Sequence, residues 1–230
     1  GSGGIARRRT LPEGILPARN AELRAVYDAD PGINAAVAAQ FRTRAAGSLD
    51  ALLAMELDAV YIATPAHLHA AQADACRRAG KHVLCEKPLG LTVAQVRRMT
   101  RSFRDSGLLL APAFMMRFQS QHAQAARWIR AGRLGTPVYA RAQLSCWYPP
   151  IPGAWRQDPA LGGGGSLMDL GGHCIDLLEM MLGPAAEVRA VTGRLAHRYA
   201  VEDSATVLLR FASGAQATVD TFFCIPDFAS

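Results

Sequence analysis

The chain has 230 residues, of which 50% are hydrophobic and 19% are charged, with a net charge of +6. This balance excludes a disordered chain and leaves enough apolar residues for one large or two modest cores. No apolar run approaches the length of a membrane span, and the N-terminus lacks the order of a signal peptide, so we expect a soluble protein.

The cysteines and the basic residues are both scattered. The five cysteines are odd in number and widely spaced in apolar segments: Cys76, Cys85, Cys146, Cys174 and Cys224. They predict core thiols in a reducing, cytoplasmic compartment, with neither a disulfide framework nor a metal site. The positive charge is spread over several helices without a basic block, which argues against nucleic-acid binding but suits an anionic dinucleotide.

The first six residues, GSGGIA, match a GxGxxA turn, with Gly1, Gly3 and Ala6 at the motif positions. Such a turn lets the backbone approach a pyrophosphate at a helix N-terminus, and it normally follows a β-strand. No strand precedes it here, and a GSG start is also a common cloning remnant.

Asp28 closes a strand predicted over Leu23–Tyr27. An acidic residue at this distance after the glycines is where a carboxylate that binds the adenine ribose of a dinucleotide is expected. The alternative is a turn residue ahead of Asp30 and Pro31.

Strands and helices then alternate with short connections, as in right-handed parallel crossover units. The predicted elements are a helix over Ile33–Phe41, a helix capped by Ser48, strand Leu57–Ala63, a helix from near His67 to Gly80, strand Val83–Cys85, a helix capped by Thr92 and strand Leu108–Ala113. This order predicts a doubly wound parallel sheet.

Glu86 and Lys87 follow the strand Val83–Cys85, and Pro88 prevents that strand from continuing. Ligands of open α/β sheets bind at the carboxyl ends of strands, so this pair is a candidate for catalysis. The alternative is a surface ion pair.

The pattern changes after residue 113. A helix capped by Ser120 is followed by strand Val138–Cys146 and by strands over Glu187–Ala196, Ala205–Phe211 and Ala217–Cys224, with Ser213-Gly214 turning the last pair. They predict a second domain with an antiparallel sheet. The Pro- and Gly-rich loop after Cys146 contains Tyr148, Trp155 and Arg156, which are candidate substrate contacts because such loops commonly lie over sites. Packing of the loop is the alternative.

A helix predicted over Ser166–Leu182 carries Asp169, His173 and Asp176 at i, i+4 and i+7, hence on one face. A histidine between two carboxylates can transfer a proton. The alternatives are a capping role for Asp169 and a core histidine. Gly171 and Gly172 cost about 1 kcal/mol each in a helix interior, which favours close passage of a ligand or another backbone.

Two stretches, IATPAHLHAAQADACRRAGKHVLCEKP and GGGSLMDLGGHCIDLLEMMLG, strongly resemble the Gfo/Idh/MocA oxidoreductases, the glucose-fructose oxidoreductase and inositol dehydrogenase group. The likeness covers nearly the whole chain. It implies an NAD(P)-binding Rossmann domain over residues 1–113 and a substrate-binding α+β domain with an open, mainly antiparallel sheet over residues 114–230.

The resemblance also implies residue roles. Lys87 matches the catalytic lysine, His173 the catalytic histidine and Asp169 the substrate-binding aspartate. The implied cofactor contacts are Gly1, Gly3 and Ala6 at the pyrophosphate, Asp28 at the ribose, and Thr64, Pro65, His69 and Glu86 beside the nicotinamide. Two departures, the missing strand before Gly1 and a shorter C-terminal part, lead us to expect a chain that lacks segments found in the family.

We therefore expect an NAD-dependent oxidation of a secondary alcohol on a sugar, cyclitol or related polyol. NADP is disfavoured because Asp28 would repel its 2′-phosphate. A homo-oligomer formed through the open sheet is expected. The alternatives are a catalytically silent ligand-sensing regulator of the same fold and an NAD-assisted glycoside-cleaving enzyme.

Overall fold

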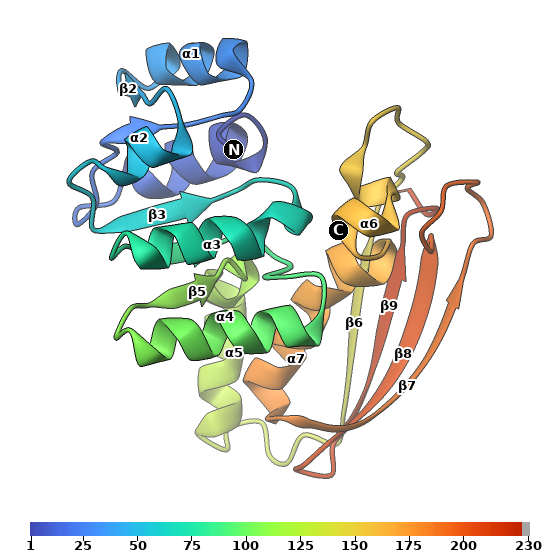
Figure 1. Ribbon diagram of the computed structural model, residues 1–230. Coiled ribbons are helices and arrows are strands. Elements are labelled where there is room, and N and C mark those ends of the chain that lie inside the picture. The colour runs from blue at the N-terminus through green and yellow to red at the C-terminus, as the bar shows by residue number, and fades with distance from the viewer. Residues whose placement is uncertain (227–230) are drawn as a thin grey trace. The chain divides into compact units, whose positions relative to one another are not determined.

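In the computed structural model, the chain forms two compact units, Gly1–Ala113 and Phe114–Ser230, and residues 1–226 are described (Figure 1). The first unit contains a two-stranded and a three-stranded sheet, the second unit contains a four-stranded sheet, and each unit has its own buried apolar clusters.

The first unit alternates strands and helices. In chain order its elements are η1 (Ala6–Ile15), β1 (Ala25–Val26), α1 (Pro31–Gln40), β2 (Arg44–Ala45), α2 (Leu49–Leu53), β3 (Ala59–Ile62), η2 (Ala66–Leu68), α3 (His69–Arg78), β4 (His82–Cys85), α4 (Val93–Asp105) and β5 (Leu110–Pro112). η1 is a π-helix and η2 a 3₁₀-helix.

Side-chain caps start the helices of the first unit. The Ser48 hydroxyl accepts a hydrogen bond from the Ala51 N–H at 3.0 Å, and the Thr92 hydroxyl accepts one from the Gln95 N–H at 3.2 Å. Gly80, with φ +72°, follows α3 in the left-handed conformation that favours glycine. The predicted caps at Ser48 and Thr92 and the predicted stop at Gly80 are confirmed.

The strands of the first unit form two separate parallel ladders. β1 pairs with β2, and β3, β4 and β5 pair in that order, but no ladder joins β1 to β3 within residues 1–226. The parallel alternation agrees with the predicted sheet. The strand expected over Leu23–Tyr27 is only two residues long, and β2 was not predicted, because Arg44–Ala45 is exposed and lacks the apolar run of a buried strand.

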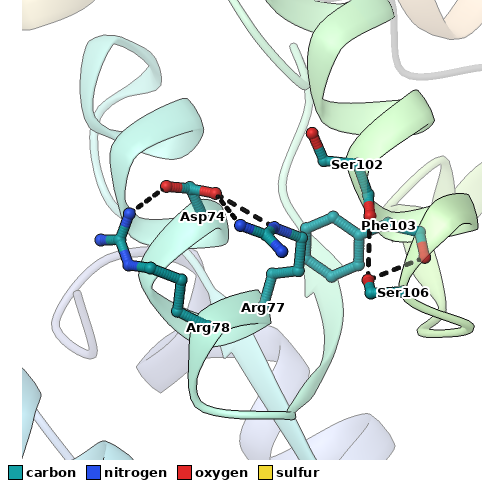
Figure 2. A network of polar contacts seen from close by, with 6 residues as sticks. All are labelled: Asp74, Arg77, Arg78, Ser102, Phe103 and Ser106. Atoms are coloured by element: carbon teal, nitrogen blue, oxygen red, sulfur yellow. Dashed lines mark hydrogen bonds and ion pairs between the residues drawn. The ribbon is translucent and has the colours of Figure 1, made fainter.

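Helices α3 and α4 contact each other, and both are fastened by local polar contacts (Figure 2). Asp74 of α3 accepts hydrogen bonds from Arg77 and Arg78 one turn later. At the end of α4 the Ser106 hydroxyl donates to the Phe103 carbonyl, and the Phe103 ring is 2% exposed in the core of this unit. Each of these two helices therefore has a polar outer face and a buried inner face.

The second unit packs one long helix on a four-stranded sheet. Its elements are η3 (Met115–Phe118), α5 (Ser120–Arg130), β6 (Tyr139–Ser145), η4 (Trp155–Gln157), α6 (Pro159–Gly162), η5 (Leu167–Gly171), α7 (Gly172–Leu182), β7 (Ala185–Gly193), β8 (Ser204–Phe211) and β9 (Gln216–Phe222).

The sheet of the second unit has the order β6-β9-β8-β7, with β6 and β9 parallel and the other pairs antiparallel. Gly214, with φ +89°, turns β8 into β9, which confirms the predicted hairpin. The inner face packs against α7 through Cys174, Leu178 and Leu182. The mainly antiparallel sheet agrees with the predicted fold class.

Two predictions for the second unit need correction. Ser120 does not cap its helix: it is the first residue of α5, Gln119 precedes it, and no side chain caps the start. The helix expected over Ser166–Leu182 is divided into a π-helical turn, η5, and the α-helix α7. The Ser166 hydroxyl donates to the Thr221 carbonyl at 3.2 Å, so its partner is β9 and not its own helix.

All five cysteines are free thiols. Within residues 1–226, no helix combines the length and apolarity that a membrane span requires.

Candidate functional site

The glycine turn and Asp28 meet in the first unit. Asp28 Oδ2 accepts hydrogen bonds from the N–H groups of Ser2 and Gly3, at 2.7 and 3.2 Å. Burial raises the pKa of Asp28, but hydrogen bonds from the backbone of Asp30, Ser2 and Gly3 oppose burial, and the pKa is lowered below its usual value. The carboxylate therefore stays charged beside the turn.

The small residues of the turn are required by close packing. A Cβ on Gly1 would lie 2.7 Å from the Ala63 carbonyl oxygen, and a Cβ on Gly3 would lie 2.6 Å from Ile33. Ala6 is 3% exposed and starts η1 within a buried cluster that includes Val26. These are the roles that the dinucleotide-binding motif gives to its small residues: a tight turn and close helix–strand packing.

The start of η1 is suited to an anion. The Arg8 N–H donates to the Gly4 carbonyl, whereas the preceding N–H groups of Gly4 and Ile5 have no acceptor among residues 1–226. A Cβ on Gly4 would meet nothing within 4 Å. Open N–H groups at a helix start, with free space in front of them, fit a pyrophosphate group.

The loops that follow β3 and β4 are joined through His69. Its ring is 0% exposed, with Nε2 at 2.9 Å from the Thr64 carbonyl oxygen and Nδ1 at 2.8 Å from the Pro88 carbonyl oxygen. Both ring nitrogens thus face carbonyl oxygens of the candidate site. His69 positions Thr64-Pro65 and Lys87-Pro88 relative to each other.

Glu86 and Lys87 lie at the carboxyl end of β4. The Glu86 N–H donates to the Ile62 carbonyl at 2.9 Å, and Glu86 Oε1 accepts from the Tyr61 hydroxyl at 2.6 Å. Burial and then the Glu86 carboxylate raise the pKa of Tyr61, so the phenol remains a donor. Lys87 is partly exposed, and its peptide bond to Pro88 is cis.

In the second unit, Asp169 lies on η5 and is held by the preceding loop. Its Oδ1 accepts from Arg156 Nε at 3.1 Å, and the guanidinium carbon of Arg156 lies 4.2 Å from the centre of the Trp155 ring. The structure therefore brings together three predicted site residues from the loop and the helix. Tyr148 makes a different contact: its ring packs against Phe223 with centroids 5.0 Å apart.

His173 lies on the first turn of α7. Its ring meets the edge of Phe114, with centroids 6.0 Å apart and an interplanar angle of 81°. Asp176, predicted on the same face, is 9% exposed and accepts from Arg117 Nε at 2.6 Å. That hydrogen bond raises the pKa of Arg117 further, so Asp176 is neutralised by a lasting positive charge.

Gly171 has a structural explanation that Gly172 does not share. A Cβ on Gly171 would lie 2.6 Å from Leu167 Cδ1, while a Cβ on Gly172 would make only an ordinary contact, 3.7 Å from Phe114. Within the second unit, the side chain of Leu167 occupies the space beside Gly171. The packing of η5 therefore accounts for Gly171 without a ligand.

Two residues that support the candidate site, Arg117 and Glu202, were not predicted from the sequence. Arg117, from η3, neutralises Asp176, and Glu202 accepts hydrogen bonds from the N–H groups of Gly165 and Leu167, at 2.8 and 3.0 Å. Glu202 thereby caps the start of η5, which carries Asp169. Both partners are distant in sequence, so local spacing contained no signal for them.

Among residues 1–226, no group of three or more His, Cys, Asp and Glu side chains could hold a metal ion.

Both halves of the chain match known families. Residues 1–114 match an oxidoreductase family with an NAD-binding Rossmann fold, and residues 122–228 match the GFO/IDH/MocA C-terminal domain.

Named relatives include dehydrogenases and reductases. The chain is 34% identical, over 229 residues, to D-xylose 1-dehydrogenase (NADP(+)) 2 of Haloferax volcanii, covering 99% of this chain and 69% of that protein. It is 36% identical, over 161 residues, to 1,5-anhydro-D-fructose reductase of Ensifer adhaerens, covering 69% of this chain but only 48% of that protein. The chain thus matches about half the length of the reductase.

Among solved structures, levoglucosan dehydrogenase in complex with NADH and levoglucosan superposes with a TM-score of 0.89 at 27% identity, covering 98% of this chain and 66% of that chain. GenD2 from gentamicin A biosynthesis, in complex with NAD, superposes with a TM-score of 0.84 at 31% identity, over 90% of this chain and 60% of that chain. The family matches span both units, and the chain belongs to the Gfo/Idh/MocA oxidoreductase family.

Proposed function

We propose that this protein oxidises a secondary alcohol of a sugar, cyclitol or related polyol with NAD. The observation that carries the proposal is the contact of the Asp28 carboxylate with the N–H groups of Ser2 and Gly3, which sets an acidic side chain beside a glycine turn at a helix start. This is the arrangement that binds a dinucleotide through its pyrophosphate and its ribose hydroxyls.

The first unit supplies the proposed cofactor contacts. The turn of Gly1, Gly3 and Ala6 holds the pyrophosphate, and Asp28 accepts hydrogen bonds from the ribose hydroxyls. Thr64, Pro65 and Glu86 contact the nicotinamide side, and His69 supports them by joining the two loops. When bound, the nicotinamide ring supplies the hydride acceptor.

The acid–base chemistry is assigned to Lys87 and His173. In the oxidation, a hydride leaves the carbinol carbon with its electron pair, and the hydroxyl proton goes to the His173 ring. The Lys87 ammonium stabilises the negative charge that develops on the same oxygen. Asp169 holds a neighbouring hydroxyl and orients the histidine.

The Pro- and Gly-rich loop after Cys146 is proposed to act on the substrate through the guanidinium group of Arg156. Arg156 lies between Trp155 and Asp169, so it can fix the carboxylate while its remaining N–H groups contact substrate hydroxyls. We retain Tyr148 as a proposed substrate contact at the margin of this loop, although its ring is largely taken up by Phe223.

The cofactor proposal is tested by titrating the protein with NADH and NADPH, following binding by calorimetry. We expect saturable binding with NADH preferred, because the Asp28 carboxylate repels a 2′-phosphate. Asp28→Asn should weaken NADH binding about tenfold and reduce the preference, since one charged hydrogen bond contributes about 1.5–3 kcal/mol. Asp50→Asn, an exposed aspartate of α2, is the control. Equal affinities for the two cofactors in the unchanged protein would contradict the assignment.

The chemistry is tested by a screen of sugars and polyols for NADH production. Lys87→Ala should lower kcat by about 10²- to 10³-fold, because it removes the charge that stabilises the oxyanion. The control is Lys81→Ala, since Lys81 donates to the Met55 carbonyl in the same unit. Full turnover in Lys87→Ala would refute the role, and cleavage of a glycoside without net NADH would favour NAD-assisted cleavage instead.

We also propose that the outer face of the second sheet joins two copies of the chain. Leu208 of β8 and Val191 of β7 are 49% and 76% exposed, and Leu208 lies between the exposed polar residues Thr206 and Arg210 of β8. Sedimentation should show a dimer that Leu208→Asp dissociates, while Asp105→Asn, an exposed change in α4, leaves it intact. A monomer at micromolar concentration would exclude this pairing.

A further inference from the structure

A row of hydroxyl groups in the first unit joins η1 to the residue that follows β4. The Thr10 hydroxyl oxygen lies 3.0 Å from the Tyr61 hydroxyl oxygen, and the Tyr61 hydroxyl donates to Glu86 Oε1 at 2.6 Å. Thr10 lies on η1, Tyr61 on β3, and Glu86 just after β4. Three elements that are distant in the sequence are thus connected by two consecutive hydrogen bonds, which we call the hydroxyl relay.

The protons of the hydroxyl relay point in one direction. Tyr61 gives its single hydroxyl proton to the Glu86 carboxylate, so its oxygen can only accept from Thr10, and Thr10 is the donor. Burial and then the Glu86 carboxylate raise the pKa of Tyr61, so the phenol keeps this proton at neutral pH. Consecutive hydrogen bonds polarise one another, and a bond to a carboxylate is among the strong ones.

Packing fixes the ring of Tyr61. The ring packs against the buried cluster that contains Ala6 of η1, whereas its neighbours Val60 and Ile62 belong to the cluster on the other face of β3. Successive side chains of a strand alternate between its two faces, so this division follows from the strand itself. The Tyr61 hydroxyl is therefore presented to Glu86 from a rigid support.

The Glu86 carboxylate is oriented through both of its oxygens. Oε1 accepts from the Tyr61 hydroxyl, and Oε2 accepts from the Lys87 N–H at 3.3 Å. A carboxylate offers about four acceptor sites, so these two bonds leave capacity for a donor from a ligand. The amide group of a nicotinamide carries two N–H donors and is a ligand of this kind.

We propose that Tyr61, supported by Thr10, is a positioning residue that holds the Glu86 carboxylate in the orientation that accepts from the amide of the nicotinamide. This inference rests on the proposed function, which puts Glu86 on the nicotinamide side of the cofactor. Without the Tyr61 hydroxyl, the carboxylate is distributed over several rotamers, and the affinity for the nicotinamide falls with the fraction in the productive one.

Calorimetric titrations of the whole chain with NADH and with ADP-ribose, which keeps the pyrophosphate but lacks the nicotinamide, separate positioning from a merely structural role. Tyr61→Phe should weaken NADH binding about fivefold and ADP-ribose binding by less than about twofold. The matched control is Tyr139→Phe, which removes a hydroxyl that contacts Thr218 in the second unit and should leave both affinities unchanged. Equal losses for the two ligands, or no loss for NADH, would overturn the proposal.

Variants of Thr10 test the far end of the hydroxyl relay. Thr10→Val keeps the shape of the side chain but removes the donor, and it should weaken NADH binding about twofold. Thr10→Ser restores a hydroxyl and should bind NADH as the unchanged protein does. If both variants weaken NADH binding equally, the hydroxyl of Thr10 has no part in positioning Glu86.

A double-variant cycle tests whether Tyr61 acts through Glu86. In a Glu86→Ala background, Tyr61→Phe should change the NADH affinity by less than about 1.5-fold, because the group that it orients is gone. A fivefold loss in that background would overturn the proposal.

The same titrations separate this inference from the proposed function. If the unchanged protein binds neither NADH nor ADP-ribose, the proposed function fails, and the positioning role fails with it. If the unchanged protein binds both ligands and Tyr61→Phe binds NADH equally well, the positioning role alone fails.

Discussion

Asp203 stabilises the second unit through its charge. Its side chain is 0% exposed and accepts hydrogen bonds from the N–H groups of Leu195, Ala196 and His197 at 2.8–3.1 Å. Burial raises the pKa of this carboxyl, but the three N–H groups outweigh burial and lower the pKa below its usual value. The folded state therefore favours the ionised form.

This lowered pKa sets a pH dependence. The stabilisation is fully present above the unfolded-state pKa of about 3.9 and is lost as the pH falls through the lower folded-state pKa. Asp203→Asn should destabilise the protein at pH 7 by about 1–3 kcal/mol, because the amide accepts these hydrogen bonds poorly. In urea unfolding followed by circular dichroism, the deficit should shrink below about pH 4 as the wild-type carboxyl is protonated. A deficit that is unchanged at low pH would contradict this explanation, and Asp105→Asn serves as an exposed control.

Two glycines of the second unit should respond oppositely to alanine. A Cβ on Gly165 would lie 1.9 Å from the Glu202 carbonyl oxygen, so the backbone would have to move. Gly165→Ala should cost about 3 kcal/mol of unfolding free energy. The new methyl group of Gly172→Ala would make only a 3.7 Å contact with Phe114, so this change at the start of α7 should stabilise by up to about 1 kcal/mol through helix propensity. Similar unfolding midpoints for the two variants would show that the contact with Glu202 is unimportant.

At the scale of elements, helix starts that look alike in the sequence differ in the structure. Ser48 and Ser120 both precede helical patterns, but only Ser48 accepts a hydrogen bond from its helix. Ser120 lies inside α5, where its hydroxyl is 3.4 Å from the Gln121 side chain. The pattern of residues locates a helix, whereas the backbone conformation of one residue decides which side chain caps it.

This difference gives a matched pair of variants. Ser48→Ala should lower the unfolding free energy by about 1 kcal/mol, because it removes a cap from α2. Ser120→Ala should change the unfolding free energy by less than about 0.5 kcal/mol. Chemical unfolding of both variants, monitored by helical ellipticity, checks the ranking, and a larger loss for Ser120→Ala would reverse the capping assignment.

The sequence predicted the elements of the first unit better than their lengths. The β-branched run before Thr64 and the stop at Gly80 identified β3 and α3, because burial on both faces leaves an apolar run. β1 is shorter than predicted, since among residues 1–226 the strand that pairs with it is the two-residue β2. The ends of a strand depend on the neighbouring strand with which it pairs, and that pairing is decided by the tertiary structure.

At the scale of the whole molecule, the proposed catalytic residues belong to different units. Lys87 follows β4 in the first unit, whereas His173 and Asp169 lie on α7 and η5 in the second. The proposed reaction requires Lys87 and His173 to act on the same oxygen.

A double-variant cycle tests this requirement. Lys87→Ala and His173→Ala should each lower kcat by about 10²- to 10³-fold, and the double variant should lose much less than the product of the two effects. When two residues stabilise the same transition state together, removing either one removes most of that stabilisation, so the second substitution lowers kcat little further. Steady-state kinetics on the substrate found in the screen provide the measurement. Multiplicative losses would show independent roles, and Lys81→Ala combined with His173→Ala is the control for a distant lysine.

The sequence by itself determined the family, the parallel and antiparallel character of the two sheets and the local motifs, because these depend on residue spacings within one strand or helix. Only the tertiary structure decided that Arg117 neutralises Asp176 and that Glu202 caps η5. Arg117 and Asp176 are 59 residues apart, and Glu202 is 35 residues from Leu167. Such pairs form only when packing brings distant segments together, and no periodicity in the sequence records that contact.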